Sequence, residues 1–252
     1  MGKPIFLTLL LAVFFSCKDK EIPPVSSCVG EIVPNFWRTS CDNYPIDTSA
    51  VCSCNDMGSF KLEASSIECF PLYCKEIGDV IQYVNDKGEV LNMVVSNKTY
   101  NQYSGFHSAY KPCFGDSPKV NVYHLDYEQL SVLLISESTN LQLVLSIKTI
   151  PDLSQEGEGR VGDFLEIARR KTFGDWAVDL TAVVHQRSLS YPKEVFQEYY
   201  EQVELLGKTF SKVISHDVTN YANSKPFKYY YTTERGLVGF VDQSEVLWRI
   251  AN

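Results

Sequence analysis

The sequence has no excess of basic residues, and it has no cysteine after Cys113. Its 252 residues carry 23 lysines and arginines against 31 aspartates and glutamates, which gives a formal net charge of −8. This balance argues against nucleic acid as a partner, because nucleic acid binding requires a basic surface. Hydrophobic residues make up 44% of the chain, so a sizeable core can be buried. We expect one large domain or two modest ones.

The apolar run near the N-terminus is too short to span a bilayer, which takes about 20 residues. This run, Ile5–Phe15, is interrupted only by Thr8 and follows a single basic residue, Lys3. A short apolar run behind a positive charge is typical of an export signal. The sequence therefore predicts that the protein leaves the cytoplasm.

The residues after this run indicate which kind of signal it is. A conventional signal peptidase requires small residues at positions −3 and −1, and a cut after Ser16 would place Phe14 at −3. In a lipoprotein signal, a small residue instead precedes a cysteine that receives diacylglycerol, and Cys17 has that position. The alternative is that Cys17 forms a disulfide in an ordinary secreted protein. Acyl chains on Cys17, palmitate among them, would anchor the protein without a transmembrane helix.

Two segments resemble exported lipoproteins of the Bacteroidota. Leu-Ala-Val-Phe-Phe-Ser16-Cys17 and the following Lys-Asp-Lys-Glu are similar to the lipobox and charged tether of that group. The resemblance implies a signal peptide over residues 1–16, a lipidated tether over 17–27, and display on the outer face of the outer membrane. The run from Tyr229 to Trp248, with Tyr-Tyr and Gly-Leu-Val-Gly-Phe, resembles the last strands of uncharacterised lipoproteins, with Glu245 in place of a turn glycine.

Seven cysteines remain if Cys17 carries lipid, and an oxidising location makes disulfides their expected state. Three bridges would leave one thiol over, and Cys52 and Cys54 are too close in sequence to pair comfortably with each other. A zinc site from Cys52-x-Cys54 and Cys69-x4-Cys74 is the alternative, but one spacing is tight and the region has no histidine, so we expect no metal. The disulfide candidates are Cys28, Cys41, Cys52, Cys54, Cys69, Cys74 and Cys113.

The pattern changes from turn-rich to alternating at about Gly78. Residues 28–77 are rich in cysteine, proline, asparagine and aspartate, which favours an irregular segment stapled by disulfides. Residues 78–252 contain roughly ten strand-like runs with short connections, so we predict a mainly β domain, an antiparallel sandwich or open barrel. Residues 163–171 and 193–206 also fit short helices. The clearest strands lie at 80–84, 89–94, 120–135, 141–148, 176–184, 210–218 and 229–250.

Motifs for catalysis and cofactor binding are absent or misplaced. Gly157, Gly159 and Gly162 match the dinucleotide fingerprint, but an acidic loop precedes them where a strand is required, so we expect no cofactor. The four histidines lie outside known metal or catalytic spacings. The sequence has no Gly-x-Ser-x-Gly elbow; the segment Tyr103-Ser104-Gly105-Phe106-His107 comes nearest to one, and its spacing has no mechanistic logic. No catalytic residue can be assigned from the sequence, and we expect that the protein is not an enzyme.

Aromatic residues are the remaining indication of function. Exposed tyrosine offers apolar area with a polar edge, as sugar-binding and protein-binding faces require. β-sheets also select tyrosine for packing, and that interpretation is favoured. The candidate binding aromatics are Tyr100, Tyr103, Tyr110, Tyr229, Tyr230 and Tyr231.

Three hypotheses for function follow from the sequence. The favoured one is a lipid-anchored, surface-exposed protein of the outer membrane that binds a glycan or an envelope protein, or acts structurally. The second is an exported hydrolase of glycans or peptides, whose site is assembled from residues distant in sequence. The third is a half-barrel that holds lipid in a dry cavity. A deep cleft that holds two carboxylates, or histidine with serine or cysteine, would favour the hydrolase, and a flat aromatic patch would favour binding.

Overall fold

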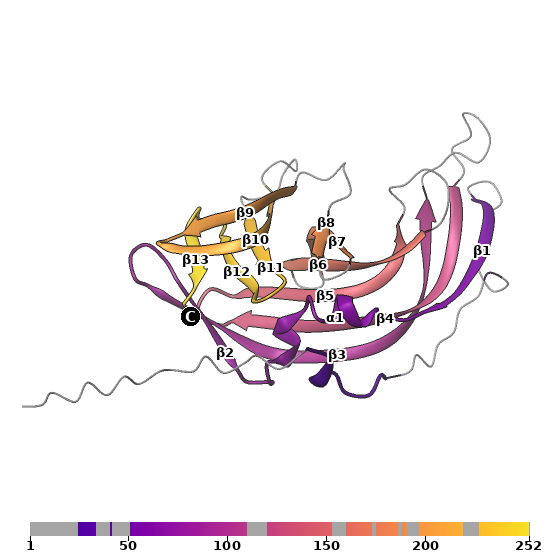
Figure 1. Ribbon diagram of the computed structural model, residues 1–252, viewed down its shortest axis with the longest axis horizontal. Helices are drawn as coiled ribbons and strands as arrows, with labels where there is room; N and C mark the ends of the chain where they lie inside the picture. The colour runs from indigo at the N-terminus through magenta and orange to yellow at the C-terminus, as the bar shows by residue number, and fades with distance from the viewer. Residues whose placement is uncertain are drawn as a thin grey trace, which may run out of the picture.

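The computed structural model describes residues 25–33, 41, 51–109, 120–152, 160–172, 175–185, 188–190, 197–218 and 227–251. Most of these residues belong to one strongly curved sheet that forms an open half-barrel (Figure 1). The short helices are η1 (Val25–Ser27), α1 (Ala64–Ile67) and η3 (Pro71–Cys74). The strands are β1 (Val51–Phe60), β2 (Val80–Val84), β3 (Val90–Ala109), β4 (Val120–Ser136), β5 (Leu141–Asp152), β6 (Arg160–Thr172), β7 (Asp175–His185), β8 (Ser188–Ser190), β9 (Gln197–Leu205), β10 (Lys208–Asp217), β11 (Lys228–Thr232), β12 (Gly236–Val241) and β13 (Leu247–Ile250).

The described strands form a single 13-stranded sheet. Twelve of them run in the order β8-β7-β6-β5-β4-β3-β2-β13-β12-β11-β10-β9, and each pairs with its neighbours in antiparallel fashion. The last strand, β13, pairs with β2, so the end of the chain closes against the start of the β domain. The prediction of a mainly β, antiparallel open barrel is confirmed.

Local sequence explains the turn of the predicted hairpin at β2 and β3. The side-chain oxygen of Asn85 accepts hydrogen bonds from the backbone N–H groups of Lys87 and Glu89, at 3.0 and 2.9 Å. Gly88 has φ of 76°, a conformation that glycine adopts without a steric penalty. Asparagine and glycine together therefore set the register of this hairpin.

A segment of the chain packs on one face of the curved sheet and fills its interior. We call residues 61–75, which contain α1 and η3, the plug, and the face of the sheet that it covers the inner face (Figure 1). Phe70 and Leu72 of the plug are 0% and 3% exposed. Alternate residues of the long strands meet them, as the period of two in the sequence predicts. From β4 and β5 these are Leu130, Val132, Leu134, Leu143, Leu145 and Ile147, all fully buried.

Two segments that also fitted helices are strands. Residues 163–171 lie in β6, where Leu165, Ile167 and Arg169 are buried and the strand is paired on both sides by β5 and β7. Residues 197–205 form β9, which pairs with β10. The helical interpretation was wrong because neighbouring strands satisfy the backbone groups of both segments, which spacing alone does not reveal.

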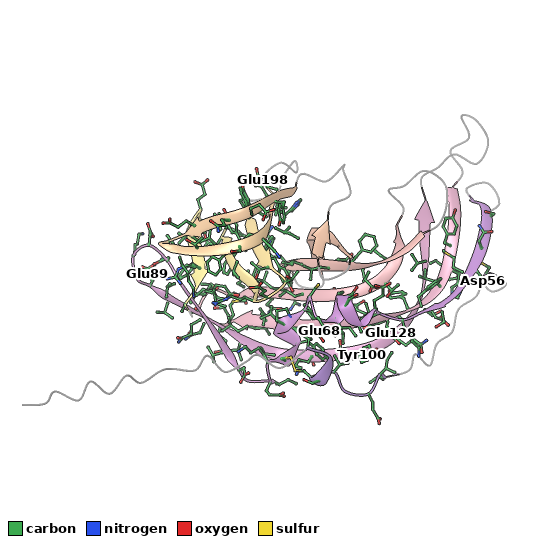
Figure 2. The ribbon with its side chains drawn as sticks, in the orientation of Figure 1. Asp56, Glu68, Glu89, Tyr100, Glu128 and Glu198 are labelled. Carbon is green, nitrogen blue, oxygen red and sulfur yellow. A yellow bond between two sulfur atoms is a disulfide. The ribbon has the colours of Figure 1, made fainter. Side chains whose placement is uncertain are left out.

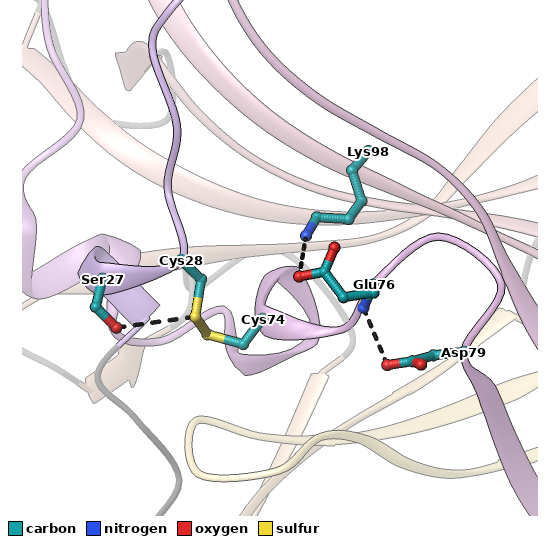
Figure 3. Close-up of polar contacts among 6 residues, drawn as sticks. All are labelled: Ser27, Cys28, Cys74, Glu76, Asp79 and Lys98. Carbon is teal, nitrogen blue, oxygen red and sulfur yellow. Dashed lines mark hydrogen bonds and ion pairs between the residues drawn. A yellow bond between two sulfur atoms is a disulfide. The ribbon is translucent and has the colours of Figure 1, made fainter.

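The Cys-rich segment is stapled, and it contains a strand that the turn-rich composition concealed. Disulfides join Cys28 to Cys74 and Cys41 to Cys54. The first ties η1 to η3, next to the Lys98 and Glu76 ion pair at 3.9 Å (Figure 3). The second ends on β1, which pairs in parallel with β4. Residues 28–77 are therefore less irregular than predicted.

The other cysteines do not all follow the prediction. Cys69 belongs to neither bridge: its thiol is buried and donates to the backbone carbonyl of Ser65 at 3.5 Å. Its assignment as a disulfide candidate is corrected, because the plug buries it within the core, away from the two bridges. Cys17, Cys113 and the side chain of Cys52 lie outside the described residues.

The turn between β12 and β13 explains the place of Glu245. This residue has φ of 62°, in the left-handed region where glycine is favoured. The side chain of Asp242 accepts hydrogen bonds from the N–H groups of Ser244 and Val246 and from the indole of Trp248. These contacts hold the turn closed although a glutamate occupies the position of the expected glycine.

We predict that Cys69 resists alkylation in the native protein. Peptide mapping of the non-reduced chain should recover the Cys28–Cys74 and Cys41–Cys54 pairs, and iodoacetamide should modify Cys69 only after denaturation, because the side chain is 1% exposed. Rapid labelling of Cys69 under native conditions, or its recovery in a disulfide, would contradict this packing of the plug.

Candidate functional site

The sheet forks along β4. Residues 120–127 of β4 pair with β1, and residues 129–136 pair with β5, whereas β3 lies beside both halves. Side chains of directly opposite residues in paired strands point to the same face. The first half of β4 therefore presents its inner-face side chains together with those of β1 and β3, beyond the part of the sheet that packs on the plug.

A serine, a histidine and an aspartate meet on these three strands. Ser104 Oγ of β3 lies 2.9 Å from Nε2 of His124 on β4. Nδ1 of the same imidazole lies 2.7 Å from Oδ1 of Asp56 on β1. Asp56 and His124 are opposite each other in the register of the two strands, and Figure 2 shows Asp56 on β1 at the far end of the curl from the C-terminal strands.

The environment of His124 defines its tautomer. A carboxylate can only accept, so the Asp56 contact requires the proton on Nδ1 and leaves Nε2 as the acceptor for the Ser104 hydroxyl. The side chain of His124 is 9% exposed and packs against the ring of Phe106, with centroids 5.0 Å apart. The side chain of Asp56 is 51% exposed. The imidazole is thus shielded, and the carboxylate that orients it reaches solvent.

Two further carboxylates hold the start of the plug. Glu128 Oε2 accepts hydrogen bonds from the Leu62 N–H at 3.1 Å and from the Tyr100 hydroxyl at 2.7 Å (Figure 2 labels Tyr100 and Glu128). Asp163 accepts from the Glu63 N–H at 2.9 Å and from the Thr149 hydroxyl at 2.6 Å. We call Glu128 and Asp163 the carboxylate clamp. Because their partners are backbone and hydroxyl groups of the fold, the clamp is a structural feature.

The phenol of Tyr100 has a perturbed pKa. Burial, followed by the hydrogen bond to Glu128 and the charge of that carboxylate, raises the pKa of Tyr100 well above its ordinary value. All three causes disfavour the phenolate, because it would be desolvated, would lose the hydrogen bond that the phenol donates, and would lie beside another negative charge. In the folded protein the phenol of Tyr100 is therefore protonated and donates its hydrogen bond to Glu128 of the carboxylate clamp.

The predicted binding tyrosines do not form one exposed face among the described residues. Tyr229 and Tyr231 are 0% exposed, so their assignment as binding residues is corrected: on β11 they belong to the core. Tyr230 is partly buried, and Tyr103 stacks on Tyr127 with ring centroids 5.7 Å apart. Sheet packing accounts for these tyrosines, and Tyr110 lies outside the described residues.

The structure describes several residues of the zinc and dinucleotide motifs. Cys54 and Cys74 are bonded in disulfides, so they are not thiolate ligands. In the described ranges, no group of three or more His, Cys, Asp or Glu residues is placed to hold a metal ion. Gly162 lies in β6, which pairs antiparallel with β5, so this glycine belongs to a strand and not to a helix; Gly157 and Gly159 lie outside the described residues.

Sequence reasoning missed the grouping of Ser104, His124 and Asp56. His124 lies 20 residues from Ser104 and 68 from Asp56, so no local spacing relates the three residues. A weak signal existed, because Ser104 and His124 are polar residues at positions of β3 and β4 that face inward. Finding the site required the pairing of β4 with β1.

Comparison with known proteins gives no significant match to a protein-family model, a curated protein or a solved structure. Among the residues that the structure describes, no helix is long and apolar enough to cross a membrane.

We predict that Tyr100→Phe lowers stability at neutral pH and flattens its decline at alkaline pH. Loss of the hydrogen bond to Glu128 should cost about 1 to 2 kcal/mol at pH 7. Because folding raises the pKa of Tyr100, the protonated phenol contributes its full stabilisation below the pKa of about 10 that it has in the unfolded chain. This contribution is lost as the pH rises through the pKa of the folded state.

Urea unfolding between about pH 8 and pH 11 measures both effects. The pH slope of the unfolding free energy should be less steep for the variant than for the wild type above about pH 10. Parallel curves over the whole range would show that Tyr100 does not titrate in this environment.

Proposed function

We propose that this chain is an exported, lipid-anchored hydrolase whose nucleophile is Ser104. The observation that carries the proposal is the continuous hydrogen-bonded chain from Ser104 through His124 to Asp56, at 2.9 and 2.7 Å. A nucleophile within reach of a base, and a base oriented by a third group, is the arrangement that activates serine for acyl transfer. The reaction class is hydrolysis of an ester or amide, with glycan esters or peptides of the envelope as substrates.

Each residue has a distinct role in the proposed reaction. Ser104 Oγ forms a bond to the acyl carbon, and its proton passes to Nε2 of His124. The imidazolium then donates that proton to the departing alcohol or amine. A water molecule, deprotonated by the same nitrogen, cleaves the acyl-serine ester and restores the hydroxyl. Asp56 holds the imidazole in the required tautomer and stabilises its charged form.

The strands support this chemistry by holding the three groups rigidly. Ser104, His124 and Asp56 lie within ladders of β3, β4 and β1, so their backbones are fixed on both sides of β4. A site built on strands keeps its geometry better than one built on loops. Pre-orientation of this kind lowers the entropy that a reacting group must lose.

The structure favours the hydrolase over the other two hypotheses. Serine and histidine are brought together, and the tyrosines expected on a flat binding face are largely packed in the sheet. The lipid-carrier hypothesis requires a dry cavity inside the half-barrel. Phe70, Leu72 and other plug residues fill the interior between β2–β6 and β10–β13, so less space is left there for a lipid.

Lipid anchoring is supported by the sequence at Ser16 and Cys17. The small residue and the cysteine follow an apolar run too short to be a membrane span. The site would then face the envelope compartment in which glycans and peptides are found, and the location on the surface of the outer membrane belongs to the same proposal.

We expect a serine-directed fluorophosphonate to label Ser104 in the purified protein, and Ser104→Ala to abolish both labelling and hydrolysis of a 4-nitrophenyl ester. Asp56→Asn should reduce kcat/KM by about 10² to 10⁴, because an amide can favour the wrong tautomer. Mass spectrometry of the labelled peptide identifies the serine.

Ser131→Ala is the matched control for this experiment. Ser131 is a half-buried serine of β4 that accepts a hydrogen bond from Gln129 and has no part in the proposed reaction. Its variant should retain labelling and activity. Labelling of wild type and Ser104→Ala to the same extent, or no labelling of the wild type, would contradict the hydrolase.

We also expect metabolic labelling with radioactive palmitate to mark the full-length protein, and Cys17→Ala to lose the label and leave the membrane fraction. Cys28→Ala is a suitable comparison, since it removes a cysteine shortly after Cys17 but one that the structure places in a disulfide. A mature wild-type protein without palmitate would contradict lipid anchoring and leave the hydrolase to be judged separately.

A further inference from the structure

Asp126 lies directly opposite the proposed nucleophile. The register of β3 and β4 pairs Ser104 with Asp126. The backbone N–H of Gln102 donates to Val33, away from β4, so every second residue of β3, Ser104 included, belongs to a pair without hydrogen bonds between the two strands. In such pairs the Cα atoms are about 4.5 Å apart and the side chains are closest. The Asp126 carboxylate and the Ser104 hydroxyl therefore occupy adjacent places on the inner face.

One oxygen of this carboxylate has no donor. Oδ1 of Asp126 is buried and has no hydrogen-bond partner among the described residues. The hydroxyl of Ser104 bonds instead to His124, and Ser59, opposite Asp126 on β1, accepts a hydrogen bond from Gln102 at 3.3 Å. A buried carboxylate oxygen without a donor lowers stability, and water or a ligand can supply the missing group.

The residue is placed so that a ligand can supply this group. Asp126 as a whole is only partly buried, and its register places it on the same face as Ser104, beside the position of a molecule that reacts there. Asp56 of β1 and Glu128 of β4 lie on the same face of the sheet, and their carboxylates add negative potential near Asp126. That potential attracts a cation and repels an anionic head group.

We propose that Asp126 binds the ammonium group of the substrate, and that the substrate is an ester or amide of an amino acid with a free amino group. The inference rests on the proposed function of Ser104 and adds a specificity residue to it. An ammonium offers three donors and a compensating charge, so it satisfies a buried carboxylate better than a neutral hydroxyl does. The short distance between paired side chains places that ammonium within a few atoms of the acyl carbon.

The test compares two esters that differ only in the charge. L-Alanine methyl ester and N-acetyl-L-alanine methyl ester are hydrolysed by the full chain at about pH 6.5, below the pKa of about 7.7 for an α-amino group. The wild type should prefer the charged ester by about 10-fold to 100-fold in kcat/KM. Asp126→Asn should bring the ratio to within about 3-fold, through a loss of kcat/KM on the charged ester.

Controls separate this inference from the proposed hydrolase. Asp86→Asn, in the exposed turn between β2 and β3, removes the same charge far from the site and should keep the wild-type preference. If Asp126→Asn does not fold, Asp126→Ser is used, and inhibition of wild type by L-alaninamide but not by its N-acetyl form gives a second readout.

The possible outcomes are distinct. The role of Asp126 is overturned if hydrolysis depends on Ser104 but shows no preference for the charged ester. It is also overturned if the preference survives in Asp126→Asn. In both cases the proposed hydrolase stands. Equal rates for wild type and Ser104→Ala on both esters overturn the hydrolase, and the specificity falls with it. Loss of the preference in Asp126→Asn alone supports both.

Discussion

The candidate site depends on how β4 divides its hydrogen bonds between two neighbours. Its first half pairs in parallel with β1 and its second half antiparallel with β5, while β3 lies along the other side. This division brings Asp56, from the N-terminal segment, beside His124, which lies 68 residues later. Without β1 on this edge, the imidazole would lack the carboxylate that selects its tautomer. Because the Cys41–Cys54 disulfide ends on β1, covalent bracing and candidate chemistry belong to one structural unit.

The inner face of the half-barrel has two parts with different physical roles. Against the plug it is apolar, and burial of residues such as Phe70 provides the main stabilisation, at roughly 25 cal/mol per Å² of apolar surface. Beyond the plug it is polar. The clamp residues Glu128 and Asp163 mark the boundary, where they satisfy backbone N–H groups at the start of the plug that would otherwise be buried without partners.

The polar part contains the residues of the candidate site and a carboxylate oxygen to which the described part of the chain supplies no donor. Tyr100 and Glu128 are joined by a hydrogen bond. Ser104, His124 and Asp56 form a continuous hydrogen-bonded chain that ends at the serine hydroxyl. Oδ1 of Asp126 has no donor among the described residues. Stability is commonly sacrificed locally where a site must bind or react. The contrast between a satisfied clamp and an unsatisfied carboxylate two residues away is the physical basis for reading this region as functional.

The sequence by itself determined the mainly β class and several of the strands. Alternation identified β5 and the hairpin of β2 and β3, because a half-buried strand must repeat every two residues. The period of the pattern did not distinguish a strand from a helix at residues 163–171. Pairing with β5 and β7 makes this segment a strand. Only the tertiary structure revealed the parallel pairing of β1 with β4 and buried Tyr229 and Tyr231. The site was invisible in the sequence because hydrogen bonds between strands bring together residues that no local pattern relates.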